Sequence, residues 1–532
     1  MRGSGGAGDS GADDDGIEGV VVHGRSVRRV RPARKREAHA PSVTFAGGCH
    51  ARISLTNLPV TDKRARHRGP PRGENGRESM SKNGITRRNV MRNGAGVLAA
   101  TAVGAPMVHA QGTAGSLRFA FWDHWVPGAN AALQQLAQRW GAQNRVNMTL
   151  DFINTTGNQL QLTIAAQAQS RSGHDGISLL PWDPGTYASQ LEPCDDVMSR
   201  LSAKYGAVNP VAEFLGKREG AWRGVPATAG TQTKPACVRF DLLQQHAGID
   251  IRAMWPARGE RGPTADTWTW DTFLTAAEAC HRAGFPFGLP MGQFTDAVDW
   301  VGALFLSYGA RITDERGNPT IRGNQELRQA IDYAVRLSRF LPNDVWAWDD
   351  ASNNRALISG RSALIFNPPS AWAVAKRDAP QVAENCWTVP MPAGPRGRFL
   401  AYLPYITGIW AFGRNKTAAK SFLEFISERE SAELCSTMSQ GYDIPPFLSM
   451  ADFPVWEREG PPVGTIYNYP LKAHQQATYS IAFSPAPPEL AQQMYIRALN
   501  TQVIARIAQG GESMDTALGW LEREINNMRR GG

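Results

Sequence analysis

The stretch SLRFAFWDHWVPG, residues 116–128, opens the part of the chain that has a regular apolar pattern. Apolar and polar residues alternate from Ser116 to Phe121, and a period of two is typical of a β-strand. An aromatic and polar loop, Trp122–Gly128, follows the strand. From Ala131 to Trp140 the apolar residues recur at helical spacing. The stretch therefore predicts a strand, a loop and an amphipathic helix in that order.

The same alternation continues beyond this first unit. Residues 146–153 read as a second strand, 157–170 as a second amphipathic helix, and 175–180 as a short buried strand that ends in Pro181-Trp182-Asp183. A β–α–β–α–β rhythm at this spacing predicts a parallel sheet with crossover helices. Ligands of such sheets bind at the carboxyl ends of the strands, where the loops that follow 121 and 180 both fall.

Upstream of this region, Thr86–Ala110 reads TRRNVMRNGAGVLAATAVGAPMVHA. A basic segment, a short apolar run and small residues at Val108-His109-Ala110 indicate a secretory signal. The paired Arg87 and Arg88 resemble a twin-arginine export signal, which implies the twin-arginine translocase as a partner during export. An apolar run of this length is too short to cross ~30 Å of hydrocarbon, which argues against a transmembrane helix.

Residues 1–79 precede this signal and carry no helical or strand periodicity. They are rich in Gly, Arg and Pro, a composition that does not bury enough apolar surface to fold. A nucleic-acid-binding arm is the alternative interpretation of their basic block at 28–36. We favour translated upstream DNA with the true start at Met80, so that 80–110 is the signal peptide.

The positive net charge of the chain lies almost entirely before residue 111. Residues 1–110 carry 19 Lys and Arg against 9 Asp and Glu, so of the 57 and 48 in the whole chain the remainder keeps 38 and 39. The mature protein is therefore close to neutral. We expect neither nucleic acid nor an anionic membrane surface as its partner.

The remaining length, residues 111–532, is enough for two or three domains. It contains no apolar run long enough to span a membrane, and no Cys follows the signal as a lipidation site would require. We therefore expect a freely soluble protein of the periplasm. The five later cysteines are widely spaced and lack metal-ligand spacing, so we expect mostly core thiols, with a disulfide as the alternative: Cys194, Cys237, Cys280, Cys386 and Cys435.

Several segments, taken in order, resemble extracellular solute-binding protein family 1, the maltose-binding-protein-like components of ABC importers. The segments are Asp175–Pro193, Ala221–Ala227 with Phe240–Ile249, Thr267–Phe273 with Thr269 as a helix N-cap, Ile358–Asn367, and Gly408–Ile426. Together they cover nearly all of residues 115–440.

The resemblance implies a type II periplasmic-binding-protein fold, an α/β class with two lobes. Each lobe would be a mainly parallel sheet flanked by helices, with the ligand cleft between the lobes. We expect the first lobe to comprise 115–228 with about 401–441. The second lobe would comprise 229–400 with about 442–532, where 490–509 and 513–529 read as closing helices.

A sugar would need aromatic platforms for its C–H faces and polar groups for its hydroxyls. Residues of both kinds follow predicted strands or lie in nearby loops, and we expect the ligand-binding set to be Trp122, His124, Trp125, Trp182, Asp183, Gln293, Asp296, Trp372 and Tyr405. The alternative for Trp122, Trp182 and Trp372 is a place in the core. The aromatic and acidic loop 346–350 is a further candidate, or else covers a helix end.

No motif of a nucleophilic, metal-dependent or phosphate-binding enzyme is present in the sequence. We expect a binding protein without catalytic residues, cofactor or metal, which closes about a hinge on a small solute, with a sugar or oligosaccharide as the favoured class. The expected partners are this solute and the transmembrane subunits of an ABC permease, and the expected state is a monomer. A periplasmic glycosidase is the competing class, because paired carboxylates converge only in space. A receptor subunit for a sensor kinase is a third.

Overall fold

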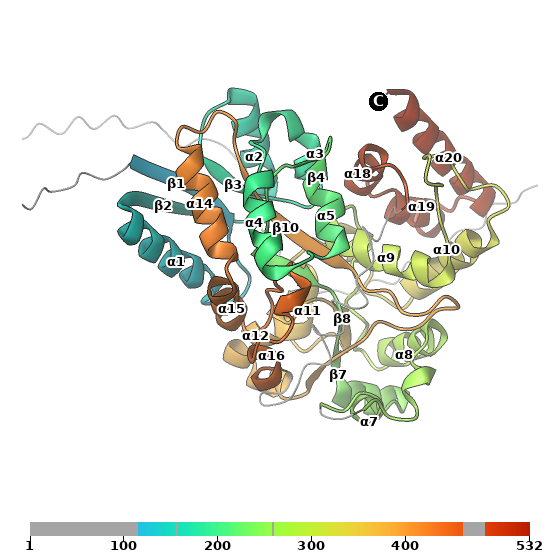
Figure 1. The fold of residues 1–532 in the computed structure, drawn as a ribbon. Coiled ribbons are helices and arrows are strands. Elements are labelled where there is room, and N and C mark those ends of the chain that lie inside the picture. The colour runs from blue at the N-terminus through green and yellow to red at the C-terminus, as the bar shows by residue number, and fades with distance from the viewer. Residues whose placement is uncertain (1–114, 156–157, 258–259, 461–484, 532) are drawn as a thin grey trace, which may run out of the picture. The chain divides into compact units, whose positions relative to one another are not determined.

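The computed structural model describes residues 115–155, 158–257, 260–460 and 485–531, all within one compact unit of the chain, Ala105–Gly532 (Figure 1). The predicted upstream segment 1–79 and the predicted signal peptide 80–110 lie outside the described residues. The described part folds around two larger sheets, and the short strands β4 (Lys217–Arg218) and β5 (Ala221–Trp222) form a third, two-stranded sheet.

The first sheet has five strands in the order β2-β1-β3-β10-β6. The strands β1, β2 and β3 run parallel, whereas β10 is antiparallel to both of its neighbours, β3 and β6. Their bounds are β1 Gly115–Trp122, β2 Val146–Ile153, β3 Gly176–Leu179, β6 Val225–Thr233 and β10 Tyr402–Ile409. The helices α1 (Ala129–Asn144) and α2 (Gln159–Ser170) connect the first three strands, so the predicted β–α–β–α–β unit is confirmed.

Close packing between β1 and β3 places a constraint on the sequence. A β-carbon at Gly176 would lie 2.2 Å from the ring of Phe119, so only glycine fits opposite that ring. The α1 helix buries Leu133, Leu136 and Trp140, the apolar residues that gave it its helical period. The carboxyl ends of β1, β2 and β3 meet at one edge of the sheet, where the cavities described below are found.

The second sheet has three strands in the order β8-β7-β9. Both ladders are antiparallel, with Val238 of β7 opposite Leu364 of β8 and Trp387 of β9. The bounds are β7 Ala236–Arg239, β8 Leu364–Phe366 and β9 Cys386–Val389. The expectation of a mainly parallel sheet is therefore corrected for this part of the fold. More than a hundred residues separate β7 from its partners, so local sequence carries no information on strand direction.

The chain passes from the first sheet to the second through Lys234 and Pro235, which join β6 to β7. It returns through the segment between β9 and β10. Helices with the second sheet include α8 Trp270–Arg282, α9 Thr295–Tyr308, α10 Gln325–Ser338, α11 Ser352–Ile358, α12 Ser370–Asp378 and α13 Pro380–Ala383. Helices α14 Lys416–Ser427 and α15 Arg429–Met438 follow β10 and pack with α1.

The remaining elements before residue 460 are mostly short. They are α3 Asp183–Thr186, η2 Ala188–Gln190, α4 Asp195–Tyr205, α5 Pro210–Gly216, β4 Lys217–Arg218, β5 Ala221–Trp222, α6 Phe240–Leu242, η3 Leu243–Ala247, α7 Ile251–Met254, η4 Ala265–Thr267, η5 Val345–Ala347, η6 Leu448–Met450 and α16 Val455–Arg458.

The C-terminal region ends in three helices, α18 Pro488–Ile496, α19 Leu499–Ala508 and α20 Met514–Gly531. The α19 helix packs on α9, α10 and α20. The start of the segment after residue 441 instead contacts elements of the first sheet and its helices. The backbone N–H of Ile444 donates to the carbonyl of Thr231 at 2.9 Å, and Phe447 pairs with Val208.

Candidate functional site

A cavity, named the main cavity below, lies beside the carboxyl ends of β1 and β2. Its volume of about 440 Å³ falls within the ~300–1,000 Å³ typical of small-molecule sites. Its lining residues come from the loops after β1 and β2 and from the segments that precede α9 and α11: Trp125, Thr155, Asn158, Gln293, Phe294, Trp346, Ala347, Trp348, Asp349, Asp350 and Ala351.

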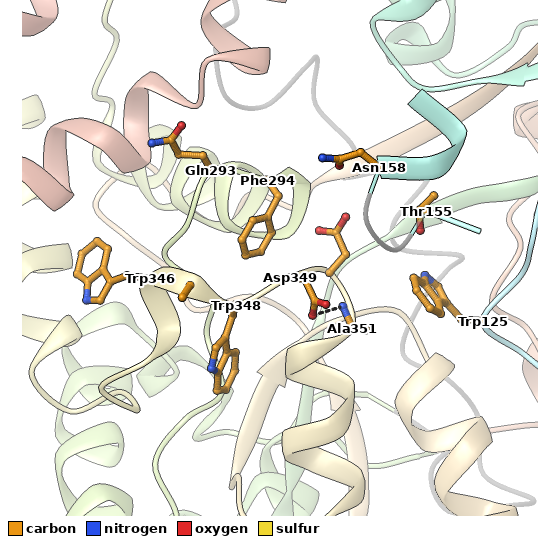
Figure 2. A pocket seen from close by; sticks show the side chains of 11 residues that line it. Trp125, Thr155, Asn158, Gln293, Phe294, Trp346, Trp348, Asp349 and Ala351 are labelled. Atoms are coloured by element: carbon orange, nitrogen blue, oxygen red, sulfur yellow. Dashed lines mark hydrogen bonds between the residues drawn. The ribbon is translucent and has the colours of Figure 1, made fainter. Parts of the chain in front are cut away.

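The walls of this cavity come from two parts of the fold: the loops that follow β1 and β2 of the first sheet, and the long connection between β7 and β8 of the second sheet. In Figure 2, Trp125, Thr155 and Asn158 lie on the side of the first sheet, across from Trp346 and Trp348. Aromatic rings therefore face the same space from two different parts of the fold. Amide and carboxylate groups stand between the rings, so the cavity offers both apolar faces and hydrogen-bonding groups.

A smaller inner cavity of about 40 Å³ adjoins the main one, with which it shares Trp125, Thr155 and Asp350. Its other lining residues come from the strand ends of the first sheet, from α2, from the crossing segment after β6, from the starts of α9 and α12, and from the segment after α15: Trp122, Gln161, Leu180, Pro181, Gln232, Lys234, Thr295, Asp296, Asn367, Pro368, Leu403, Tyr405 and Tyr442. Among the described residues, Trp122 Nε1 and Gln161 Oε1 are buried atoms there without a hydrogen-bond partner.

A buried ion network supports the floor of the inner cavity. Lys234 Nζ donates to Asp296 Oδ1 at 2.5 Å and to Asp299 Oδ2 at 2.8 Å. Asn353 Nδ2 donates to the second oxygen of Asp296, and the Tyr495 hydroxyl donates to Asp299. Burial lowers the pKa of Lys234, but the nearby carboxylates outweigh this and raise it, so the lysine stays charged. Burial also raises the pKa of Asp299.

Asp350 lines both cavities and lacks a comparable partner. The one hydrogen bond that its carboxylate accepts among the described residues is from the backbone N–H of Asp296, at 3.5 Å. Burial, followed by the negative charge of Asp296, raises the pKa of Asp350 to about 7. The neighbouring Asp349 is held differently, because Ser352 and Arg355 both donate to its Oδ1. These bonds outweigh burial and lower the pKa of Asp349.

An aromatic cluster closes the inner cavity on the side of the first sheet. The ring of Trp122 lies 5.3 Å from that of Tyr405, 5.9 Å from that of Tyr442 and 4.5 Å from that of His124. His124 Nδ1 accepts from the backbone N–H of Val126, so its Nε2 carries the proton that meets Asp443 Oδ1 at 3.0 Å. This bond fixes the ring and thereby the loop after β1.

The structure brings five of the nine predicted site residues to the two cavities. Trp125 and Gln293 line the main cavity, and Trp122, Trp125, Asp296 and Tyr405 line the inner one. His124 lies directly behind Trp122 and contacts Asp443. The aromatic and acidic loop 346–350, the further candidate from the sequence, lines the main cavity along its whole length.

The structure places the other three predicted residues away from the described linings of both cavities. Trp182 is 3% exposed and packs against Phe214 and Tyr495. Asp183 accepts from the backbone N–H of Leu180 at 2.8 Å at the start of α3. Trp372 is buried in α12, with Lys376 Nζ 4.5 Å from its ring centroid. Their predicted contact with a ligand stays a prediction, and these surroundings favour structural roles.

Sequence reasoning missed several residues that line the cavities. Thr155 and Asn158 follow the predicted second strand, so the rule that placed Trp122 would have placed them as well. Lys234 could have been found by its charge. It is a lysine between two mostly apolar strands, and a lysine in such a place needs a buried partner of opposite charge. Phe294 and Asn367 had no local signal, because their positions depend on the packing of α9 and α12.

Within the described ranges, no group of three or more His, Cys, Asp or Glu side chains is placed to hold a metal ion. The described cysteines, Cys194, Cys237, Cys280, Cys386 and Cys435, are all buried and none forms a disulfide. No helix in the part of the chain that the structure describes is long and apolar enough to cross a membrane.

Two α/β sheets joined at β6–β7, with a ligand-sized cavity walled by loops of both, define the type II periplasmic-binding-protein fold. A family model described as bacterial extracellular solute-binding protein matches residues 135–461, and the chain belongs to this family. No curated protein sequence matches the chain.

Solved structures with the same fold are distant in sequence. Maltose-bound MalE3 of T. maritima is 16% identical with a TM-score of 0.63, over 78% of this chain and 100% of that chain. The sugar-binding protein MalE of Xanthomonas citri is 18% identical with a TM-score of 0.57, over 78% and 97%. A solute-binding protein of Agrobacterium radiobacter K84 in complex with ribitol is 15% identical with a TM-score of 0.60, over 78% and 99%.

Proposed function

We propose that this chain is the solute-binding component of an ABC importer and that it captures a carbohydrate or a related polyol. The observation that carries the proposal is the main cavity, whose aromatic and polar walls come from loops of both sheets. Flat rings suit the C–H faces of a sugar, and carboxylate and amide groups suit its hydroxyls. The ligands bound in two similar structures, maltose and ribitol, likewise combine C–H groups with hydroxyls.

The proposed contacts follow from the lining of the cavities. Trp125, Trp346 and Trp348 would provide stacking platforms, while Asn158, Gln293 and Asp350 would bind hydroxyls. In the inner cavity, the buried Nε1–H of Trp122 would donate to a ligand oxygen, because it has no acceptor among the described residues. Asp296 and Tyr405 would shape this inner end.

Solute capture in this fold would work by closure of two lobes about the crossing strands. We propose two lobes that meet at the crossing residues Lys234 and Pro235, close to the bounds predicted from the sequence. The first lobe holds the five-stranded sheet, and the second holds the three-stranded sheet with the C-terminal helices. The closed form would be presented to the transmembrane subunits of the permease. Export through the twin-arginine translocase to the periplasm, and action as a monomer, complete the proposal, with the paired Arg87 and Arg88 as its sequence support.

The test is a thermal-shift screen of the purified chain with sugars, polyols, amino acids and polyamines, followed by calorimetric titration. A ligand present at 100 times its Kd should raise the free energy of unfolding by about 2.7 kcal/mol. If no sugar or polyol stabilises the protein, the carbohydrate proposal is wrong. Hydrolysis of chromogenic glycosides by the same preparation would favour a secreted glycosidase in its place.

A further inference from the structure

The charges that line the two cavities do not balance. Among the described lining residues, Lys234 is the one side chain with a fixed positive charge, whereas Asp296, Asp349 and Asp350 are carboxylates. Lys234 is shared between Asp296 and Asp299, with 3% of its side chain exposed. Its charge is therefore already neutralised within the protein.

One of these carboxylates has no cation of its own. Arg355 pairs with Asp349 at 2.8 Å, and Lys234 pairs with Asp296 at 2.5 Å. Asp350, which borders both cavities, has only the long backbone contact with Asp296 among the described residues. Asp350 is partly exposed, towards the cavities that it lines, and an unpaired carboxylate in such a place is costly unless it is protonated or meets a positive charge.

The aromatic walls of the main cavity also favour a ligand group with a positive charge. Trp125, Phe294, Trp346 and Trp348 line it together with Asp350. The face of an aromatic ring attracts a cation, by ~0.5–1 kcal/mol at exposed sites and about 2 or more when the cation is desolvated. The same rings also stack on sugar C–H faces, so they suit a ligand that carries both features.

We propose that the solute carries a protonated amine, as an amino sugar or an aminated polyol does, and that Asp350 is the residue that selects it. This inference rests on the carbohydrate function proposed above and narrows it to a cationic subclass. The ammonium group would lie beside Asp350 at the junction of the two cavities. The sugar ring would lie in the main cavity against the tryptophans.

The energetic preference comes from the unpaired carboxylate. A neutral sugar must either leave Asp350 charged without a counter-ion or bind it in its protonated form. An ammonium group pairs with the ionised carboxylate and removes this cost, and a charged hydrogen bond contributes roughly 1.5–3 kcal/mol. Preference for the amine over the matching hydroxyl should therefore be at least about tenfold.

The preference should depend on pH. Asp350 faces Asp296 and Asp299 of α9, Lys234 after β6, and Asp349 with Arg355 at α11. Its pKa of about 7 means that the carboxylate takes up a proton as the pH falls below neutrality. Affinity for the amine should fall by roughly tenfold per pH unit well below that value, while affinity for a neutral sugar should not follow this course.

Three disaccharides with the same linkage separate the effect of the ligand's charge on affinity from the effect of its sugar rings. Cellobiose has hydroxyls at both 2-positions, the glucosamine disaccharide has ammonium groups there, and diacetylchitobiose has neutral amides. Calorimetric titration of the full chain at pH 7 should give the glucosamine disaccharide at least tenfold tighter binding than either neutral compound, and at pH 5.5 the difference should shrink. Equal or tighter binding of a neutral disaccharide would overturn the inference and leave the carbohydrate proposal standing. Failure of all sugars and polyols to bind would overturn both.

The variant Asp350→Asn tests whether Asp350 causes the preference for the amine. It should abolish the preference for the glucosamine disaccharide over cellobiose, so that the ratio of the two affinities falls at least tenfold, whatever the loss of hydroxyl contacts does to both ligands. An unfolding midpoint close to that of the wild type reports that the variant is folded. Asp332→Asn, which removes one exposed carboxylate paired with Arg336 on α10, is the control for overall charge. An amine preference that persists in Asp350→Asn would show that another group selects the ligand.

Discussion

At the scale of the single residue, Trp182 and Trp348 illustrate two uses of the same side chain. Trp182 is 3% exposed and packs with its ring centroid 6.2 Å from that of Phe214 and 5.6 Å from that of Tyr495. Trp348 is partly exposed and lines the main cavity. The first therefore has the environment of a core residue, and the second that of a ligand platform.

Truncation of each tryptophan should reveal this difference. Trp182→Ala should lower the free energy of unfolding by roughly 3–5 kcal/mol, because it empties a packed site, and should change ligand affinity by less than about threefold. Trp348→Ala should do the reverse and weaken binding about tenfold or more at nearly unchanged stability. Denaturant unfolding and calorimetry on both variants check this. Weaker binding with normal stability in Trp182→Ala would instead support the sequence-based prediction that Trp182 contacts the ligand.

Asp183 should make the stability of the protein depend on pH. Burial raises its pKa to about 7, against ~3.9 in an unfolded chain, so between these values the folded state holds a proton that the unfolded state has lost. The free energy of unfolding should therefore fall as the pH rises from about 4 to about 7 and level off above. Asp183→Asn keeps an acceptor for the Leu180 N–H and should make this slope shallower, while the raised pKa of Asp350, also about 7, maintains the remaining part of the slope. Unfolding curves of both proteins at pH 4, 5.5 and 7 measure it, and parallel slopes would contradict it.

The candidate site could be predicted in part because position after a strand is a local property. That rule found Trp122 and Trp125 at the cavities, but it also selected Trp182, whose ring turns into the core against Tyr495, more than three hundred residues away. Asp350 was noted only as part of an acidic loop. Its unusual environment is created by Asp296 and Lys234, and no local pattern connects these residues.

At the scale of the element, helices and strands begin and end where the sequence predicts, provided that a local sequence pattern marks the boundary. The second strand was predicted at 146–153 and is found there, and Thr269 caps α8 as expected. The helix expected at 490–509 is instead two helices, because Ala498 adopts a left-handed conformation with φ of 51°. No Gly or Pro marks this break, which is stabilised by a bond from Asn500 Nδ2 to the carbonyl of Val298 on α9.

The cap of α8 provides a prediction at this scale. Thr269 Oγ1 accepts from the backbone N–H of Thr272, so Thr269→Ala should lower the free energy of unfolding by about 1 kcal/mol. Thr275→Ala is the matched control, because this exposed hydroxyl bonds only to a carbonyl of its own helix. Equal effects of the two substitutions, measured by denaturant unfolding, would contradict a capping role.

At the scale of the whole molecule, the class of fold was accessible from the sequence and the strand pairing of the second sheet was not. The order of the family-like segments from Asp175 to Ile426 predicted the fold that the comparisons confirm. The antiparallel ladders of β7 with β8 and β9 join segments that are far apart in the chain. Such pairings depend on the intervening helices, whose packing a local pattern does not contain.

Export is a property of the whole chain and depends on its leader. Expressed from Met80 in a Gram-negative host, the protein should reach the periplasm and begin near Gln111. Replacement of Arg87 and Arg88 by lysine together should leave the precursor in the cytoplasm, because the paired arginines are the feature that resembles a twin-arginine signal. Fractionation and N-terminal sequencing check both statements. Normal export of the double variant would remove the twin-arginine assignment.

The distribution of the tryptophans gives the molecule an optical property. Of its 16 tryptophans, four are partly exposed, and three of these, Trp125, Trp346 and Trp348, line the main cavity, while the fourth, Trp520, lies against Arg506. Water reaches few other indoles, so the long-wavelength part of the emission spectrum comes mainly from the cavity. A solute that displaces this water should shift the emission towards the blue, and removal of Trp520 should not affect that shift. The unlabelled protein would thus report its own occupancy by fluorescence.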